Sequence, residues 1–203
     1  MTDTVQTASR TDEHRAARLI TNGMEPRNVI VLVSLGVGLA QENRATGLLW
    51  ALEAILFSAA IPVAYIKFGM RKGMWADRHV GQRKRRLLLI PVIMASVATG
   101  IAIMIWREAP SAMVALVVAM LATLAALLPI TAFWKISVHT SVAAGSLAML
   151  AVTYGSLVWL AIPLVAVIGW SRVSLRDHTP AQTVAGAVAG AVVAGLVFTA
   201  VSA

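Results

Sequence analysis

The feature that most constrains this chain is a series of apolar blocks, each about as long as a bilayer crossing, with short polar clusters between them. The 203 residues are 59% hydrophobic and only 13% charged, and a soluble domain of this size could not hide that much apolar surface in its core. Lipid must therefore be the main solvent. We predict an all-α fold, a polytopic bundle of six or seven transmembrane helices.

The block pattern gives seven candidate spans, each near the roughly 20 residues that a bilayer requires. They cover residues 28–43, 46–66, 87–106, 111–134, 138–155, 156–171 and 181–202. Residues 1–27 are polar, lack the apolar h-region of a secretory signal, and are expected to form a partly disordered tail. The predicted organisation is thus a polar tail over 1–27 and a transmembrane domain over 28–203.

Composition also narrows the chemistry and the partners. The chain has no cysteine, which excludes disulfides, thiolate catalysis and cysteine-ligated metals. Its net charge is +8, but the basic residues stand in short loops between apolar spans instead of on a soluble face. We therefore expect membrane lipids and a phosphorylated substrate as partners, and no nucleic acid.

The basic residues also predict an orientation. With seven spans, nearly all of them fall on one side of the membrane: Arg10, Arg15, Arg18, Arg27, the eight Lys and Arg from Lys67 to Arg86, Lys135, Arg172 and Arg176. The other side holds Arg44 and Arg107. The positive-inside rule then places the tail and the basic loop in the cytoplasm and the C-terminus outside.

Three polar clusters could carry chemistry, and the same topology brings them to one face. They are Lys72 to Arg86, Lys135-Ile-Ser-Val-His139, and Ser171-Arg172 with Asp177-His178. Two spans separate each cluster from the next, so every return of the chain ends on the same side. A single site could be assembled there.

Two histidines among several basic side chains suit phosphoryl transfer. Guanidinium and ammonium groups hold phosphate oxygens and neutralise the charge that develops on them. One imidazole can attack phosphorus and a second can protonate the departing alkoxide, because both titrate near the working pH. Such a scheme needs no metal and no cofactor.

The two histidine motifs resemble those of a known family. Ser171-Arg172, five residues and then His178 is the spacing found in the type-2 phosphatidic acid phosphatase (PAP2) family, which includes haloperoxidases. Ser137-Val138-His139 is similar to the same family's proline-serine-glycine-histidine motif. The resemblance covers about residues 67–195 and implies a phosphatase-like transmembrane domain of bacterial type.

The resemblance implies a role for each motif residue. His178 would be the nucleophile, and His139 the acid that protonates the leaving group. Arg172 would bind the phosphate, with Ser137 and the backbone N–H of Val138 helping to hold the oxyanion.

The chain departs from the family at Gln182, four residues after His178, where the family usually has an aspartate that orients the nucleophile. One helical turn still puts this side chain beside the imidazole. A glutamine carbonyl can accept the Nδ1–H hydrogen bond, but it cannot stabilise an imidazolium as a carboxylate does. We expect reduced activity, or compensation by a neighbouring carboxylate such as Asp177.

The family's first motif, a lysine, six residues and an arginine-proline pair, has no clean match. The basic loop resembles a bacterial variant of that motif, which makes its polar residues candidates for binding the phosphate: Lys72, Asp77, Arg83 and Arg86.

Taken together, the residues and the resemblance predict an integral membrane lipid phosphatase. It would hydrolyse a lipid phosphate or a prenyl or polyprenyl (di)phosphate monoester through a phosphohistidine, with its site on the cytoplasmic face of a bacterial-type plasma membrane. Two alternatives stay open: an isoprenoid-diphosphate transferase or cyclase on the same scaffold, and a non-catalytic binder or transporter of an anionic lipid.

The predicted orientation is testable by tag accessibility. A protease site inserted in the 72–86 loop should be cleaved only when the cytoplasmic face is exposed, whereas a site after Ala203 should be cleaved from outside, because the basic residues favour the cytoplasmic side. Cleavage of the 72–86 loop from outside intact cells would contradict the cytoplasmic assignment.

Overall fold

The computed structural model describes residues 2–74 and 83–203, with side chains for 12–74 and 89–203. Over this part of the chain all regular structure is helical, which confirms the predicted all-α bundle. The helices are α1 (Thr2–Gly23), α2 (Pro26–Leu39), α3 (Arg44–Ile55), the π-helical turn η1 (Leu56–Ala60), α4 (Ile61–Arg71), α5 (Arg83–Trp106), α6 (Ser111–Phe133), α7 (Val138–Tyr154), the 3-10 helix η2 (Ser156–Ala161), α8 (Ile162–Ser174) and α9 (Pro180–Ser202).

Each predicted block corresponds to a helical segment. Within the described residues, 5 helical segments are long and apolar enough to cross a membrane: Arg44–Arg71, Leu89–Trp106, Ser111–Phe133, Ser156–Ser174 and Pro180–Ser202. The other two blocks are the shorter apolar helices α2 and α7. The chain is therefore an integral membrane protein by the length and composition of its helices.

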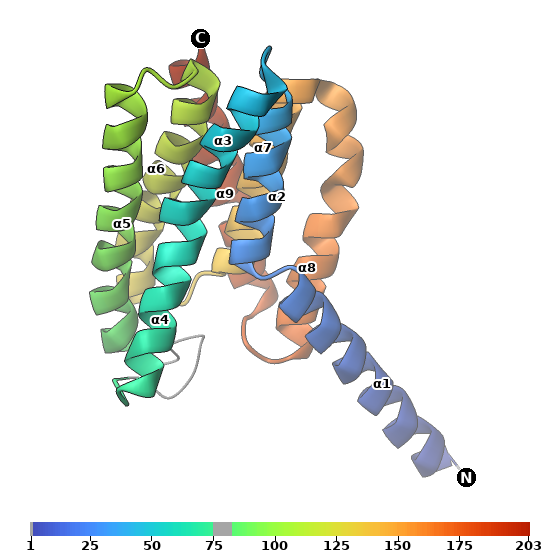
Figure 1. Ribbon diagram of the computed structural model, residues 1–203. Coiled ribbons are helices and arrows are strands. Elements are labelled where there is room, and N and C mark those ends of the chain that lie inside the picture. The colour runs from blue at the N-terminus through green and yellow to red at the C-terminus, as the bar shows by residue number, and fades with distance from the viewer. Residues whose placement is uncertain (1, 75–82) are drawn as a thin grey trace.

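The short helix α7 lies inside the bundle instead of against lipid. It packs on α9, α2 and α8, and most of its side chains are buried. Figure 1 shows it between α2 and α9. A helix held on several sides by protein need not match the bilayer thickness as a lipid-facing helix must.

The N-terminal segment differs from the prediction. A partly disordered tail was expected over 1–27, but residues Thr2–Gly23 form α1, which runs from the end of the bundle beside α8 (Figure 1). Ala17 is fully buried, the hydroxyls of Thr21 and Ser171 are 3.1 Å apart, and Ser174 donates to Glu13 at 2.9 Å. These contacts with α8 order a helix that has little hydrophobicity of its own.

Small residues bring α7 and α9 into close contact. A Cβ added at Gly186 or Gly190 would overlap the backbone carbonyls of Ser137 and Ser141. The hydroxyl of Thr140 donates to the carbonyl of Thr183 across the same contact, at 2.8 Å. This spacing of small residues is typical of membrane helices whose backbones approach closely.

Gly190 therefore offers a test of the packing. Gly190→Ala should destabilise the protein by about 1–3 kcal/mol, because the added methyl group meets a carbonyl that a whole helix holds in place. Gly195→Ala is the matched control, since its Cβ would make only an ordinary 3.4 Å contact with Ala148. Thermal unfolding in detergent should show a lower Tm for the first variant alone, and equal Tm values would contradict the described contact.

Candidate active site

Two helix starts and one helix end meet at one end of the bundle. α7 and α9 begin there and α8 ends there, at the same end as the last turn of α4 (Figure 1). Lys135, His139, Arg172 and His178 all line one cavity at this end. The second and third polar clusters of the sequence are thus brought together.

The first turn of α7 carries the first histidine motif. Ser137 is the N-cap and is fully buried; its Oγ accepts the N–H of Thr140 at 3.4 Å, and its own N–H donates to the carbonyl of Gln182 at 3.2 Å. Val138 and His139 follow as the first two helical residues, and both line the cavity. First-turn N–H groups lack intrahelical acceptors, so a helix start of this kind can donate hydrogen bonds to an anion.

A tight reversal after α8 delivers the second histidine. Arg176 has a φ of 58°, in the left-handed region, and the N–H groups of Asp177 and His178 both donate to the carbonyl of Arg172, at 3.0 and 3.2 Å. The reversal places the imidazole beside Lys135, in the segment that leads into α7. His178 Nδ1 lies 3.1 Å from the carbonyl oxygen of Lys135 and 3.3 Å from Gln182 Oε1.

These two contacts fix the tautomer of His178. Both partners of Nδ1 are acceptors, so Nδ1 must carry the proton and the lone pair stands on Nε2. Burial lowers the pKa of His178 below its ordinary value of 6.5; the carbonyl of Lys135 acts in the opposite direction, and the charge of Arg172 lowers the pKa further. The site therefore favours a neutral imidazole, the form that can attack an electrophile.

Gln182 occupies the third position of α9 and has a second role there. Its Oε1 accepts the N–H of Thr179 at 3.1 Å, while Thr179 Oγ1 accepts the N–H of Gln182 at 3.3 Å. The pair forms a capping box, which satisfies two donors at the helix start. The same carbonyl thus caps α9 and holds His178.

Arg172 is a buried cation with an unmet donor. Its residue surface is only 5% exposed, and Nη2 lies 3.0 Å from Asp177 Oδ2. Nε is buried and has no acceptor among the described residues. Asp177, which was considered as a substitute partner for the nucleophile, is engaged with Arg172 instead. A buried donor without a partner is unusual in a folded protein and suits a site that receives an oxyanion.

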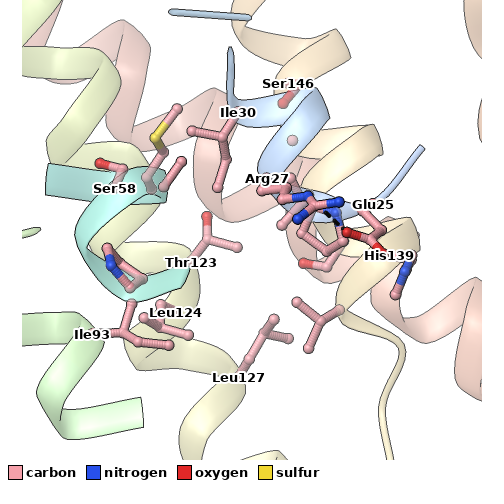
Figure 2. A pocket seen from close by; sticks show the side chains of 18 of the residues that line it. Glu25, Arg27, Ile30, Ser58, Ile93, Thr123, Leu124, Leu127, His139 and Ser146 are labelled. Carbon is pink, nitrogen blue, oxygen red and sulfur yellow. Dashed lines mark ion pairs between the residues drawn. The ribbon is translucent and has the colours of Figure 1, made fainter. Parts of the chain in front are cut away.

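The cavity combines a charged end with an apolar body. Its volume is about 580 Å³, and on α7 its lining runs from Val138 to Met149, roughly 16 Å at 1.5 Å per residue. Figure 2 shows apolar side chains of α5 and α6, among them Ile93, Leu124 and Leu127, facing it. This shape suits a molecule with an anionic head and a long apolar tail.

Residues 110–203 match the family model of the PAP2 superfamily. The matched segment runs from α6 to α9 and includes both histidine motifs. The comparisons with curated proteins and with solved structures gave no match. The PAP2 match supports the resemblance on which the motif roles rest, and with it a phosphatase-type chemistry on lipid phosphates.

The first polar cluster is placed only in part. Lys72 is the C-cap residue that follows α4; its ammonium lies 5.9 Å from the ring centre of Phe68, and it does not line the cavity. Asp77 lies outside the described residues, as do the side chains of Arg83 and Arg86. Within the described residues no group of three His, Cys, Asp or Glu could hold a metal ion.

Three charged residues that the sequence left out of the site do line the cavity. Lys67 comes from α4, and Glu25 and Arg27 come from the start of α2. Arg27 Nε lies 2.8 Å from Glu25 Oε2 (Figure 2). In the sequence Arg27 and Lys67 are basic residues that flank membrane helices, a pattern that indicates topology and not proximity to His139, and Glu25 carries no signal of its own.

A charge placed at Gln182 should change the protonation of His178. Gln182→Glu keeps the side-chain length and the capping box but adds an anion beside the imidazole, so the pKa of His178 should be higher in this variant than in the natural protein. Nitrogen NMR of labelled histidine in micelles measures both midpoints, and the natural one should lie below 6.5. Gln182→Met is the neutral control. An unchanged midpoint in the glutamate variant would contradict the contact between residues 178 and 182.

Proposed function

We propose that this protein is an integral membrane phosphatase that hydrolyses the phosphate monoester of a lipid or of a prenyl or polyprenyl (di)phosphate. The observation that carries the proposal is the buried guanidinium of Arg172, whose Nε lacks an acceptor among the described residues, in one cavity with His139 and His178. A phosphate oxygen would supply that acceptor. The apolar body of the cavity would hold the tail.

The chemistry would proceed in two steps. His178 Nε2 attacks phosphorus while the bond from phosphorus to the alkyl oxygen breaks, and His139 donates a proton to the departing alkoxide. A water molecule then gives its proton to His139 and attacks the phosphohistidine. This second step releases inorganic phosphate and restores both imidazoles.

The surroundings of His178 support this division of roles. Nδ1–H is held by two carbonyl oxygens, so Nε2 is the free nucleophilic nitrogen. Phosphorylation of Nε2 leaves a cationic ring, which two neutral acceptors stabilise less than a carboxylate would. The turnover should therefore be slower than a site with an aspartate at position 182 would give.

The membrane setting supports a lipid substrate. The charged lining residues lie at one end of the bundle, where a lipid headgroup would be, and the cavity continues between helices that are apolar enough to span the bilayer. The bias of basic residues favours the cytoplasmic face of a bacterial plasma membrane for this end. A phospholipid precursor or polyprenyl-phosphate sugar made in the cytoplasm fits that placement.

Gln182 favours one other candidate, a binder or transporter of an anionic lipid. Without a carboxylate on the imidazole, the same arginine and cavity would bind a lipid phosphate without cleaving it. The two functions differ in a single observable, the release of phosphate.

Phosphate release in detergent tests the proposal. We expect purified protein to release phosphate from at least one of phosphatidic acid, phosphatidylglycerol phosphate, a prenyl diphosphate and a polyprenyl-phosphosugar. His178→Ala should lower the rate by about 10³-fold or more because it removes the nucleophile. His14→Ala, at an exposed position of α1, should leave the rate within about twofold.

The outcomes separate the candidates. Release that survives His178→Ala would overturn the phosphohistidine mechanism. Tight binding of these lipids without any release from the natural protein would favour the binder instead.

A further inference from the structure

The start of α2 has an arrangement that helix stability does not explain. Glu25 is the N-cap but makes no side-chain cap hydrogen bond, Pro26 is the first helical residue and Arg27 is the second. Glutamate is not among the preferred N-cap residues, and a cation in the first turn opposes the helix dipole. Some other interaction must account for a guanidinium at this position.

The side chains of Glu25 and Arg27 line the cavity and do not cap the helix. Glu25 is 8% exposed and holds Arg27 Nε at 2.8 Å, and both residues line the cavity that contains His139 and Arg172. Figure 2 shows Arg27 and Glu25 on the same side of the cavity as His139. A guanidinium has five N–H donors, and the printed contact with Glu25 uses the one on Nε, so Arg27 has further donors that a ligand can engage.

The connection that carries Arg27 is held in place at two points. The side chain of Asn28 donates to the carbonyls of Asn22 and Gly23, at 3.2 and 2.9 Å, which closes the turn between α1 and α2. Thr21 contacts Ser171, the residue before Arg172. The turn is thus tied to the helix that supplies the site's other arginine.

The charges of the cavity indicate what the ligand is. Its described lining holds four cations, Arg27, Lys67, Lys135 and Arg172, and two carboxylates, Glu25 and Asp177. Without counting the histidines, the cations of this lining exceed its carboxylates by two charges. A phosphate monoester carries about −1.5 to −2 charges at neutral pH, so its dianion complements this excess.

We propose that Arg27 binds the phosphate group of the substrate, with Glu25 holding the guanidinium in position. This inference rests on the proposed function, because the anion is the substrate's phosphate monoester. Arg27 and Arg172 are arranged alike in one respect: a carboxylate contacts one nitrogen of each guanidinium, Nε of Arg27 and Nη2 of Arg172, and both residues line the same cavity. The N-terminal segment then supplies a phosphate contact that sequence reasoning sought in the 72–86 loop.

Equilibrium binding of dodecyl phosphate tests this role independently of turnover. Arg27→Gln should raise the Kd by about tenfold or more, because it removes a charge-assisted hydrogen bond to phosphate. Arg27→Lys, which keeps the charge but loses the planar fork, should raise it by a smaller factor. Arg18→Gln is the matched control, an exposed arginine on α1 outside the cavity lining, and should leave the Kd within about twofold.

Dodecanol serves as a second ligand because it has the same tail without phosphate. Its Kd should be the same for the natural protein and for Arg27→Gln, which also shows that the cavity is intact. A Kd for dodecyl phosphate within twofold of the natural value in Arg27→Gln would overturn the proposal. Equal loss of both ligands, or no binding of dodecyl phosphate by the natural protein, would overturn it as well.

The same samples separate this inference from the phosphatase proposal. Phosphate release measured on the lipid panel decides whether the site is catalytic, whereas the Kd values decide whether Arg27 binds the headgroup. Binding that depends on Arg27 without any release would refute the phosphatase and keep the inference. Phosphate release by a protein whose Kd for dodecyl phosphate does not change in Arg27→Gln would keep the phosphatase proposal and refute the role of Arg27.

Discussion

The close contact of α7 with α9 is the interaction on which the site depends. Gly186 and Gly190 let the backbones approach until Ser137 N–H reaches the carbonyl of Gln182 and Thr140 reaches that of Thr183. The first turns of two helices are thereby fixed against each other. His139 stands on the first turn of α7, and the side chain of Gln182, on the first turn of α9, contacts His178. The backbone contact between the two turns therefore sets the relative position of the two histidine motifs, and the Gln182 side chain completes it.

The sequence predicted the parts of this arrangement that follow from spacing. The apolar blocks located the helices, and an even number of crossings between polar clusters predicted that Lys135, His139 and Arg172 share one end. Gln182 stands beside His178 because four residues make one turn, although the cap at Thr179 was not foreseen. The positions of the helices, the shared end of the polar clusters and the contact of Gln182 with His178 follow from residue spacing and from the number of crossings alone.

The features that the sequence did not reveal depend on contacts between distant segments. α1 is polar and gave no apolar signal, because its order comes from packing on α8 through Ala17 and Thr21. Arg27 appeared as one of several basic residues beside a span, while Lys72, expected in the site, does not line the cavity. A basic flank near a membrane helix has the same sequence whether it faces lipid headgroups or a substrate, so only the tertiary structure distinguishes them.

The buried ion pair of Arg172 and Asp177 is explained by its place in the site and not by a contribution to stability. Moving an arginine and an aspartate out of water costs several kcal/mol per ion, and their attraction often fails to offset that cost, so the pair contributes little net stability. In the reversal that follows α8, the N–H groups of Asp177 and His178 nevertheless both donate hydrogen bonds to the carbonyl of Arg172. The five residues between Arg172 and His178 are the length that turns the chain back on the arginine. The spacing of the motif thus places the guanidinium of Arg172, the carboxylate of Asp177 and the imidazole of His178 in one cavity.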